Sequence, residues 1–251
     1  MKEPVRYRLF DPTGNITLLV ETPVPVEEQP AVARALMEQE PSAEQVGFLT
    51  ITDNRVCLRM AGGEFCGNAC MSAAASYMEQ QNRPDGAVSV SVWGTERPVL
   101  VEVSRMPDSS WQGRVQMPQP LSVCREVMPD RRILPVVRFP GITHVILEEA
   151  PNPDSETLAR EWGRQLNVEA LGLMFLNRGE STMKPLVYVP EAGTLFWETS
   201  CASGTTAVGA FTAAETGGPV DLFLKQPGGT LHIQASPNGP LYLCGRVRIL
   251  K

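Results

Sequence analysis

The sequence predicts an α+β protein that arose by internal duplication, with strands and helices in the same order in its two halves. Three observations lead to this prediction. Residues 8–19 and 138–146 each begin like a strand, reach a Pro or Gly turn and enter a second apolar strand. Each half then carries a cysteine directly before a helix of small residues. Prolines separate the halves, as expected of a linker.

The remaining elements keep this order. A Pro- and Glu-rich connector follows the first strands in each half and leads to an amphipathic helix, which we expect at 31–40 and at 155–165, the second with Ser155 as its N-cap. After these helices, residues 44–49 of the first half are similar to residues 169–174 of the second. The strands that close the two halves, 113–117 and 245–249, are similar as well. We therefore predict two domains, 1–120 carrying Cys66 and 121–251 carrying Cys201, with the active site in the cleft between them.

Composition excludes several classes of protein. Of 251 residues, 43% are hydrophobic and 20% charged, which is typical of a globular protein. The formal net charge is −6 without a basic block, so no nucleic-acid partner is expected. No apolar run reaches the roughly 18 residues of a membrane span, and residues 1–8 alternate charged and apolar side chains, unlike a signal peptide. Six dispersed cysteines favour reduced thiols, so we expect a cytoplasmic protein that acts on a small molecule.

The two cysteine–helix junctions carry the functional prediction. Cys66 and Cys201 each lie where an extended segment turns into a helix of small residues; we expect the helices to end near Gln81 and at Gly217. The positive end of the helix dipole lowers a thiol's pKa, which would supply a thiolate base. The N–H groups of the first helical turn can hold a carboxylate. The small residues that follow the cysteines allow such an approach; they are Gly67, Asn68, Ala202, Ser203 and Gly204.

Two thiols at matching places suit an exchange of protons at one carbon. One thiolate would remove an α-proton from one face, and the other thiol would return a proton to the opposite face. The alternative for each cysteine is an ordinary buried residue, because free cysteine is among the most buried residue types. We assign that alternative to the other four cysteines, namely Cys57, Cys70, Cys124 and Cys244.

These junctions resemble the diaminopimelate epimerase family of cofactor-independent racemases. Phe65-Cys66-Gly67-Asn68-Ala69 is similar to its Met-Cys-Gly-Asn-Gly motif, and Cys201-Ala202-Ser203-Gly204-Thr205 to its Ala-Cys-Gly-Thr-Gly motif. Gly14-Asn15 and Glu44-Gln45 match two further family motifs, although Ile16 stands where the family has Asp. The resemblance covers essentially the whole chain.

The resemblance implies a diaminopimelate epimerase-like fold, in which two similar domains each curl a mainly antiparallel sheet around a central helix. It also implies that Cys66 and Cys201 are the acid and the base, that neighbouring backbone N–H groups hold the α-carboxylate, and that the protein is a homodimer without a cofactor. Asn15 and Gln45 are expected to contact the substrate. Glu64 or, by preference, Glu198 would bind its ammonium group or tune a thiol.

Departures from the family pattern bear on the substrate. Gly141-Ile142-Thr143-His144 replaces a Gly-Asn-Pro-His segment, and Phe196-Trp197-Glu198 stands where the family has Glu-Arg-Gly. Diaminopimelate has a second charged amino and carboxylate pair at its far end. A pocket without those groups would leave that pair buried and unpaired, which costs a large amount of binding free energy. The stretch before and after Cys66 most resembles the histidine racemases that supply D-histidine for opine-type metallophores.

Other functions stay open. They are diaminopimelate epimerisation, and amino-acid binding without catalysis. A pyridoxal-phosphate racemase would need Lys184 or Lys225, but no phosphate-binding glycine loop lies near either. A zinc site would need more ligands at suitable spacing, and a thiol hydrolase would need His144 beside a cysteine. An isomerase of the same broad fold would need only one acid–base group.

Overall fold

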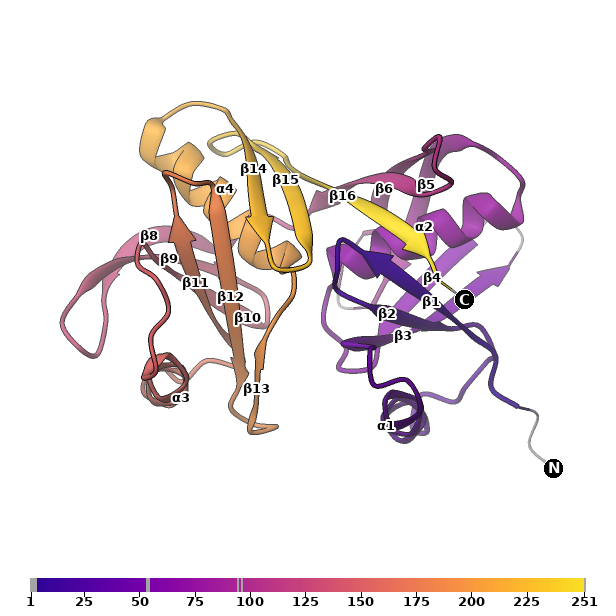
Figure 1. Ribbon diagram of the computed structural model, residues 1–251, viewed down its shortest axis with the longest axis horizontal. Coiled ribbons are helices and arrows are strands. Elements are labelled where there is room, and N and C mark those ends of the chain that lie inside the picture. The colour runs from indigo at the N-terminus through magenta and orange to yellow at the C-terminus, as the bar shows by residue number, and fades with distance from the viewer. Residues whose placement is uncertain (1–3, 53–54, 94, 96, 251) are drawn as a thin grey trace. The chain divides into compact units, whose positions relative to one another are not determined.

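The computed structural model describes residues 4–52, 55–93, 95 and 97–250, and the chain divides into two compact units (Figure 1). Unit 1 comprises Met1–Gln116 together with Cys244–Lys251, and unit 2 comprises Met117–Leu243. The predicted break after residue 120 lies close to this division. The C-terminal boundary was predicted wrongly, because the last strand joins unit 1 through backbone pairing with the first strand, including Phe10 with Ile249.

Unit 1 is a closed barrel around one helix. The order of its strands is β1-β2-β3-β4-β5-β6-β7-β16, and pairing of β1 with β16 closes the ring. The strands are β1 (Tyr7–Pro12), β2 (Thr17–Val20), β3 (Gln45–Thr52), β4 (Arg55–Met60), β5 (Asp85–Val92), β6 (Val99–Arg105), β7 (Trp111–Met117) and β16 (Leu241–Ile249). Inside lies α2 (Gly67–Gln80), in which every residue from Gly67 to Met78 is buried. Its run of small side chains allows a helix to fit within the sheet.

The second helix of unit 1 covers the outside of the barrel. This helix, α1 (Gln29–Gln39), starts two residues before the predicted position because Pro30 is accommodated in its first turn. Ala33 and Leu36 of α1 pack on Leu18, Val46 and Phe48 of the strands. The outer faces of β2 and β3 are therefore apolar as well as the inner ones.

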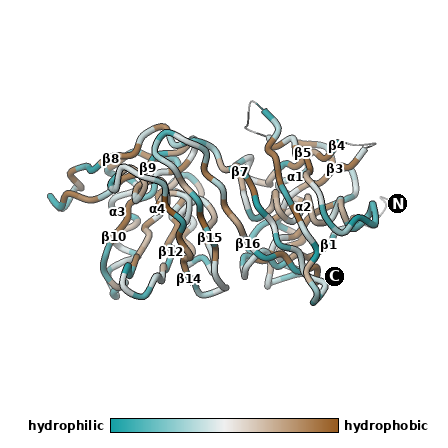
Figure 2. Tube along the Cα trace, turned by 90° about the horizontal axis from the view of Figure 1, so that it is seen from above, coloured by the Kyte–Doolittle hydropathy of each residue, from teal (hydrophilic) through white to brown (hydrophobic). Residues whose placement is uncertain are grey.

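Unit 2 has the same types of element, in a sheet with the order β15-β14-β12-β11-β10-β9-β8 and with β13 paired to β12. Its strands are β8 (Ser122–Val127), β9 (Ile133–Phe139), β10 (Ile142–Leu147), β11 (Leu171–Asn177), β12 (Thr182–Val189), β13 (Thr194–Trp197), β14 (Val220–Gln226) and β15 (Gly229–Ala235). One face packs on α4 (Ala202–Thr216) through Met174, Val208 and Phe211, and the other on α3 (Ser155–Gln165) through Trp162. The hydrophobic residues, brown in Figure 2, run mainly along the strands of each unit.

The order strand–strand–helix–strand–strand–helix occurs in both units, as β1-β2-α1-β3-β4-α2 and as β9-β10-α3-β11-β12-β13-α4 with one added strand. The α+β class is confirmed, whereas internal duplication and the narrower fold name stay predictions. Helix α3 has the predicted bounds, but its N-cap is Asp154, and the Ser155 hydroxyl instead accepts a hydrogen bond from the Asn152 N–H group. Helix α4 ends at Gly217, whose φ of 68° is left-handed, as predicted.

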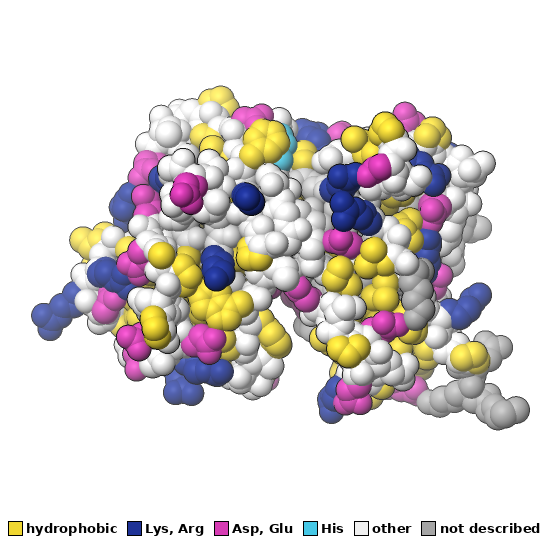
Figure 3. Space-filling view, viewed as in Figure 1, with side chains coloured by type: hydrophobic (Ala, Val, Ile, Leu, Met, Phe, Trp, Pro, Cys, Tyr) yellow, Lys and Arg dark blue, Asp and Glu magenta, His cyan; other side chains and the backbone are white. Residues whose placement is uncertain are grey.

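All six cysteines have free thiols, but they differ in exposure. Cys70 and Cys244 are buried as expected, whereas the prediction of burial is wrong for Cys57 and Cys124, whose side chains are exposed on β4 and β8. Basic, acidic and apolar side chains are interspersed on the face shown in Figure 3. In the part of the chain that the structure describes, no helix has the length and apolar character needed to cross a membrane.

Candidate active site

Cys66 caps the helix inside unit 1. It is the N-cap of α2 with extended backbone angles, and its sulfur accepts a hydrogen bond from the Ala69 N–H group at 3.4 Å. The Cys66 side chain also donates to Oε1 of Gln45 at 3.2 Å. The thiol is half-buried. The predicted junction of strand and helix is therefore present, and β3 supplies a polar partner for the sulfur.

Predicted substrate-binding residues of unit 1 form one hydrogen-bonded cluster beside Cys66. The Oδ1 atom of Asn15 accepts from Nε2 of Gln45 and, at 3.2 Å, from Nδ2 of Asn68. Gln45 also donates to Oγ1 of Thr17 at 2.7 Å, and Asn15 donates to Glu44 at 2.7 Å. Asn68 is buried, and its Oδ1 atom has no hydrogen-bond partner among the described residues. That oxygen is an acceptor available to a bound ammonium group.

Glu64 belongs to the loop that precedes Cys66. The residue is exposed overall, and its carboxylate folds back over Gly62. Local desolvation raises the pKa of the Glu64 carboxyl group, opposed by a hydrogen bond from its own backbone. A role for Glu64 in binding the substrate ammonium group or tuning the Cys66 thiol stays a prediction.

Cys201 caps the central helix of unit 2 in the same way. Its sulfur accepts from the Gly204 N–H group at 3.3 Å, and its own N–H group donates to Oε1 of Gln226 at 2.8 Å. Gln226 in turn donates to the Thr205 hydroxyl at 2.9 Å. The side chain of Gln226, from the end of β14, thus ties the first turn of α4 to the sheet. No local motif marks Gln226, so the sequence did not single it out.

The expected lowering of the thiol pKa is wrong for Cys201. Burial raises the pKa of the Cys201 thiol well above its ordinary value, since only 4% of the residue is exposed and the thiolate would be desolvated. The charge of Glu198 and a hydrogen bond to its carboxylate raise it further. Hydrogen bonds from Ser203 and Gly204 act in the opposite direction. Cys201 therefore rests as the thiol, with the Glu198 carboxylate as acceptor of its hydrogen bond.

A buried histidine reaches the same helix end. Nε2 of His144, on β10, lies 3.0 Å from Oγ of Ser203, which is 3.5 Å from the Cys201 sulfur. Burial lowers the pKa of His144 to about 3, so the ring is neutral at physiological pH. The sequence suggested His144 only as the partner of a hydrolytic cysteine, and the structure places Ser203 between the two side chains.

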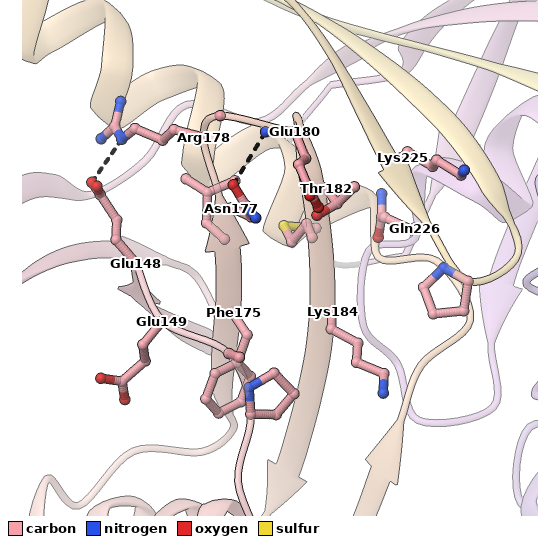
Figure 4. Close-up of a pocket in the computed structure, with 16 residues that line it drawn as sticks. Glu148, Glu149, Phe175, Asn177, Arg178, Glu180, Thr182, Lys184, Lys225 and Gln226 are labelled. Atoms are coloured by element: carbon pink, nitrogen blue, oxygen red, sulfur yellow. Dashed lines mark hydrogen bonds and ion pairs between the residues drawn. The ribbon is translucent and has the colours of Figure 1, made fainter.

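Unit 2 also contains an open groove of about 770 Å³ (Figure 4). Asn177, Thr182, Lys184, Lys225 and Gln226 line it, together with apolar side chains. Figure 4 shows the ion pair of Arg178 with Glu148 at its rim. Gln226, which lines the groove, also accepts the hydrogen bond from the Cys201 N–H group. In the described ranges, no three His, Cys, Asp or Glu side chains are grouped as metal ligands.

The structure therefore assembles the predicted residues within each unit. Gln45 contacts Cys66 and is hydrogen-bonded to Asn15, which in turn accepts from Asn68. In unit 2, Glu198 and Ser203 contact Cys201. Gly67 and Ala202 are the first residues of their helices, where backbone N–H groups have no acceptor within the helix. Each unit offers one thiol that caps a central helix and one set of N-terminal helix donors.

Comparison with known proteins gives the chain a family. Residues 4–248 match the family described as the histidine racemase CntK N-terminal domain. A histidine racemase of Fusobacterium nucleatum is 33% identical over 80% of this chain and 77% of its own. One of Staphylococcus aureus is 28% identical over 92% and 88%. A crystal structure of a probable proline racemase from Agrobacterium radiobacter covers 98% of this chain and 91% of its own, with a TM-score of 0.71 at 12% identity, and so shares the fold. The chain belongs to the histidine racemase CntK N-terminal domain family.

Proposed function

We propose that this isomerase is a histidine racemase that works without a cofactor and inverts the α-carbon by proton transfer between Cys66 and Cys201. The single observation that carries the proposal is that both cysteines are N-caps whose sulfurs accept a first-turn N–H hydrogen bond, in a chain one third identical to a histidine racemase. The names of the relatives support histidine as the substrate.

The chemistry needs two groups of opposite protonation state. A thiolate removes the α-proton from one face of the amino acid, and the electron pair passes into the carbon–carboxylate system. The opposite thiol then gives its proton to the other face, which inverts the centre. After one turnover the thiol has become the thiolate and the thiolate the thiol, so the enzyme is set for the reverse direction.

The first turns of α2 and α4 stabilise the charge that develops. Backbone N–H groups of Gly67, Asn68, Ala202 and Ser203 lie at positive helix ends, where they favour a carboxylate and the carbanion conjugated with it. The unpartnered Oδ1 atom of Asn68 is an acceptor for the α-ammonium group. These donors and acceptors come from short side chains or backbone, which leaves room for the substrate.

The two thiols have different partners. Glu198 accepts a hydrogen bond from the Cys201 thiol and repels the thiolate, so Cys201 is prepared to act first as the acid. Cys66 has the neutral amide of Gln45 instead. A substrate ammonium group near Glu198 would offset the carboxylate charge, so that Cys201 becomes a thiolate more readily when substrate is bound.

Further parts of the proposal come from the family resemblance and from element order. We infer that the product D-histidine feeds an opine-type metallophore, that the protein is a homodimer and that its two units arose by duplication. The free thiols fit the reducing cytoplasm. Diaminopimelate epimerisation is disfavoured because Ile142 and Thr143 stand where the family has Asn and Pro.

The test is α-proton exchange in D₂O. The reduced protein, without added cofactor, is incubated with single L-amino acids including histidine and with LL-diaminopimelate, and proton NMR follows the loss of the α-proton signal. We expect exchange and racemisation of histidine, and a loss of at least a hundredfold in Cys66→Ser and Cys201→Ser, while Cys57→Ser retains the rate. Binding of histidine without exchange, with thiols confirmed reduced, would establish a binding module instead.

A further inference from the structure

We propose that His144 is a positioning residue for Cys201, which acts by directing the hydroxyl hydrogen of Ser203 toward the cysteine sulfur. The catalytic role of a Cys201 thiolate rests on the proposed function. The series of hydrogen bonds from His144 through Ser203 to Cys201 does not depend on it. Its three members come from β10 and the first turn of α4, both within unit 2.

The position of the imidazole is set by close packing. His144 is fully buried, and the Phe139 ring meets it edge-on at 6.1 Å between centroids. Across the parallel β10–β11 pair, His144 is paired with Gly172, where an added Cβ would lie only 2.2 Å from Nδ1. The glycine therefore makes the space that the ring occupies. Among the residues that the structure describes, the polar contact of the ring is that of Nε2 with Oγ of Ser203, at 3.0 Å.

The burial pattern selects one tautomer. Nδ1 of His144 is buried and has no hydrogen-bond partner among the described residues. A buried N–H group without an acceptor is rarer than a buried acceptor without a donor, so the unsatisfied nitrogen is best left as a lone pair. The single proton of the neutral ring then resides on Nε2 and is donated to Ser203. A ring with its proton on Nδ1 would bury an unsatisfied N–H group.

This tautomer decides where the serine hydrogen points. Because Oγ of Ser203 accepts from Nε2 of His144, its own hydrogen is available for the Cys201 sulfur at 3.5 Å. A hydroxyl that donates to sulfur favours the thiolate, whereas the Glu198 carboxylate, which accepts from the S–H group, favours the thiol. The Gly204 N–H group also donates to the sulfur. His144 and Glu198 therefore act on Cys201 with opposite sign, and Glu198 supplies the charge.

The first experiment determines the tautomer. The chain has two histidines, so long-range ¹H–¹⁵N correlation of the ligand-free protein gives two ring patterns, and His232→Gln assigns the remaining one to His144. We expect a neutral ring with its proton on Nε2 from pH 5 to 8. A proton on Nδ1, or an imidazolium in that range, would overturn the proposal.

The second experiment measures the thiol. Iodoacetamide labelling of the ligand-free protein is followed by peptide mass spectrometry at a series of pH values, with the exposed Cys57 as an internal standard. We expect Ser203→Ala and His144→Phe each to raise the labelling midpoint of Cys201 by about one pH unit, a tenfold loss of thiolate. The double variant should shift the labelling midpoint no further than the larger of the two single variants, because both substitutions interrupt the same series of hydrogen bonds.

Conservative variants separate this role from simple packing. Ser203→Thr keeps the hydroxyl and His144→Gln keeps an N–H donor near the place of Nε2, so both should label like the wild type. An unchanged midpoint in folded Ser203→Ala, or additive shifts in the double variant, would refute the chain. Labelling needs no turnover, so these outcomes are independent of whether histidine is racemised.

Discussion

The Cys201 N–H group and Oε1 of Gln226 are 2.8 Å apart, and this bond connects the capping residue of α4 to the end of β14, 25 residues further along the chain. Nε2 of the same amide donates to the Thr205 hydroxyl, so one side chain holds two residues of the first helical turn. The N-terminal donors proposed to bind a carboxylate are therefore held by the sheet as well as by the helix.

Gln226→Ala should destabilise the protein and impair the site together. The substitution leaves the buried Cys201 N–H group without its side-chain acceptor and removes the hydrogen bond that the Thr205 hydroxyl accepts, which costs about 1–3 kcal/mol in free energy of unfolding. Denaturant unfolding measures that loss, and histidine racemisation should fall as well. Gln119→Ala, which removes an exposed hydrogen bond to the Gly239 carbonyl in the same unit, is the matched control. Equal stability of both variants would contradict the anchoring role.

Stability should decrease on mild acidification because of His144. Folding lowers the pKa of this ring from 6.5 to about 3, so below pH 6.5 the unfolded chain binds a proton that the folded chain does not. The free energy of unfolding then falls by about 1.4 kcal/mol per pH unit, or about 2 kcal/mol between pH 7 and pH 5. His144→Gln should lack this contribution and His232→Gln should keep it. Parallel stability curves for wild type and His144→Gln would show that the ring is not desolvated.

Gly172→Ala should displace the imidazole. The new Cβ would lie 2.2 Å from Nδ1 of His144, and relief of such a clash in a packed core costs about 1–3 kcal/mol. Thermal unfolding provides the measurement, and the labelling midpoint of Cys201 should rise as it does in His144→Phe. Gly218→Ala, where an added Cβ meets nothing within 4 Å, should leave both properties unchanged. If Gly172→Ala were as stable as the wild type and the labelling midpoint of Cys201 were unchanged, β10 and β11 could separate to fit the methyl group without loss of stability. That result would contradict the close packing of the imidazole.

Glu198→Gln should separate thiol reactivity from turnover. Removing the negative charge lowers the pKa of Cys201, so labelling of the ligand-free thiol at neutral pH should become about tenfold faster. Racemisation should nevertheless slow by tenfold or more, because the neutral amide cannot balance the charge of the substrate ammonium group. Glu215→Gln, which alters ion pairs with Arg125 and Arg178 elsewhere on unit 2, is the control. Faster labelling together with faster racemisation would contradict a role of the Glu198 charge in turnover.

The sequence by itself determined the features that depend on neighbouring residues. A cysteine before small residues predicts an N-cap, and both caps formed at Cys66 and Cys201. A glycine after a helix-forming run predicts a left-handed end, and α4 ends at Gly217. The first cysteine motif was sufficient to suggest the racemase family, and the comparisons confirmed that resemblance.

Only the tertiary structure decided the features that depend on distant contacts. The last strand pairs with β1 and so closes the barrel of unit 1, which no local pattern near residue 245 could indicate. The helix dipole predicted a lowered pKa for Cys201, but burial and Glu198 raise it, because desolvation depends on the whole core around the sulfur. His144 on β10 and Gln226 on β14 contact the N-terminal end of α4, although both are distant from it in the sequence. Capping is local physics, whereas desolvation and cross-sheet hydrogen bonds exist only after the chain has folded.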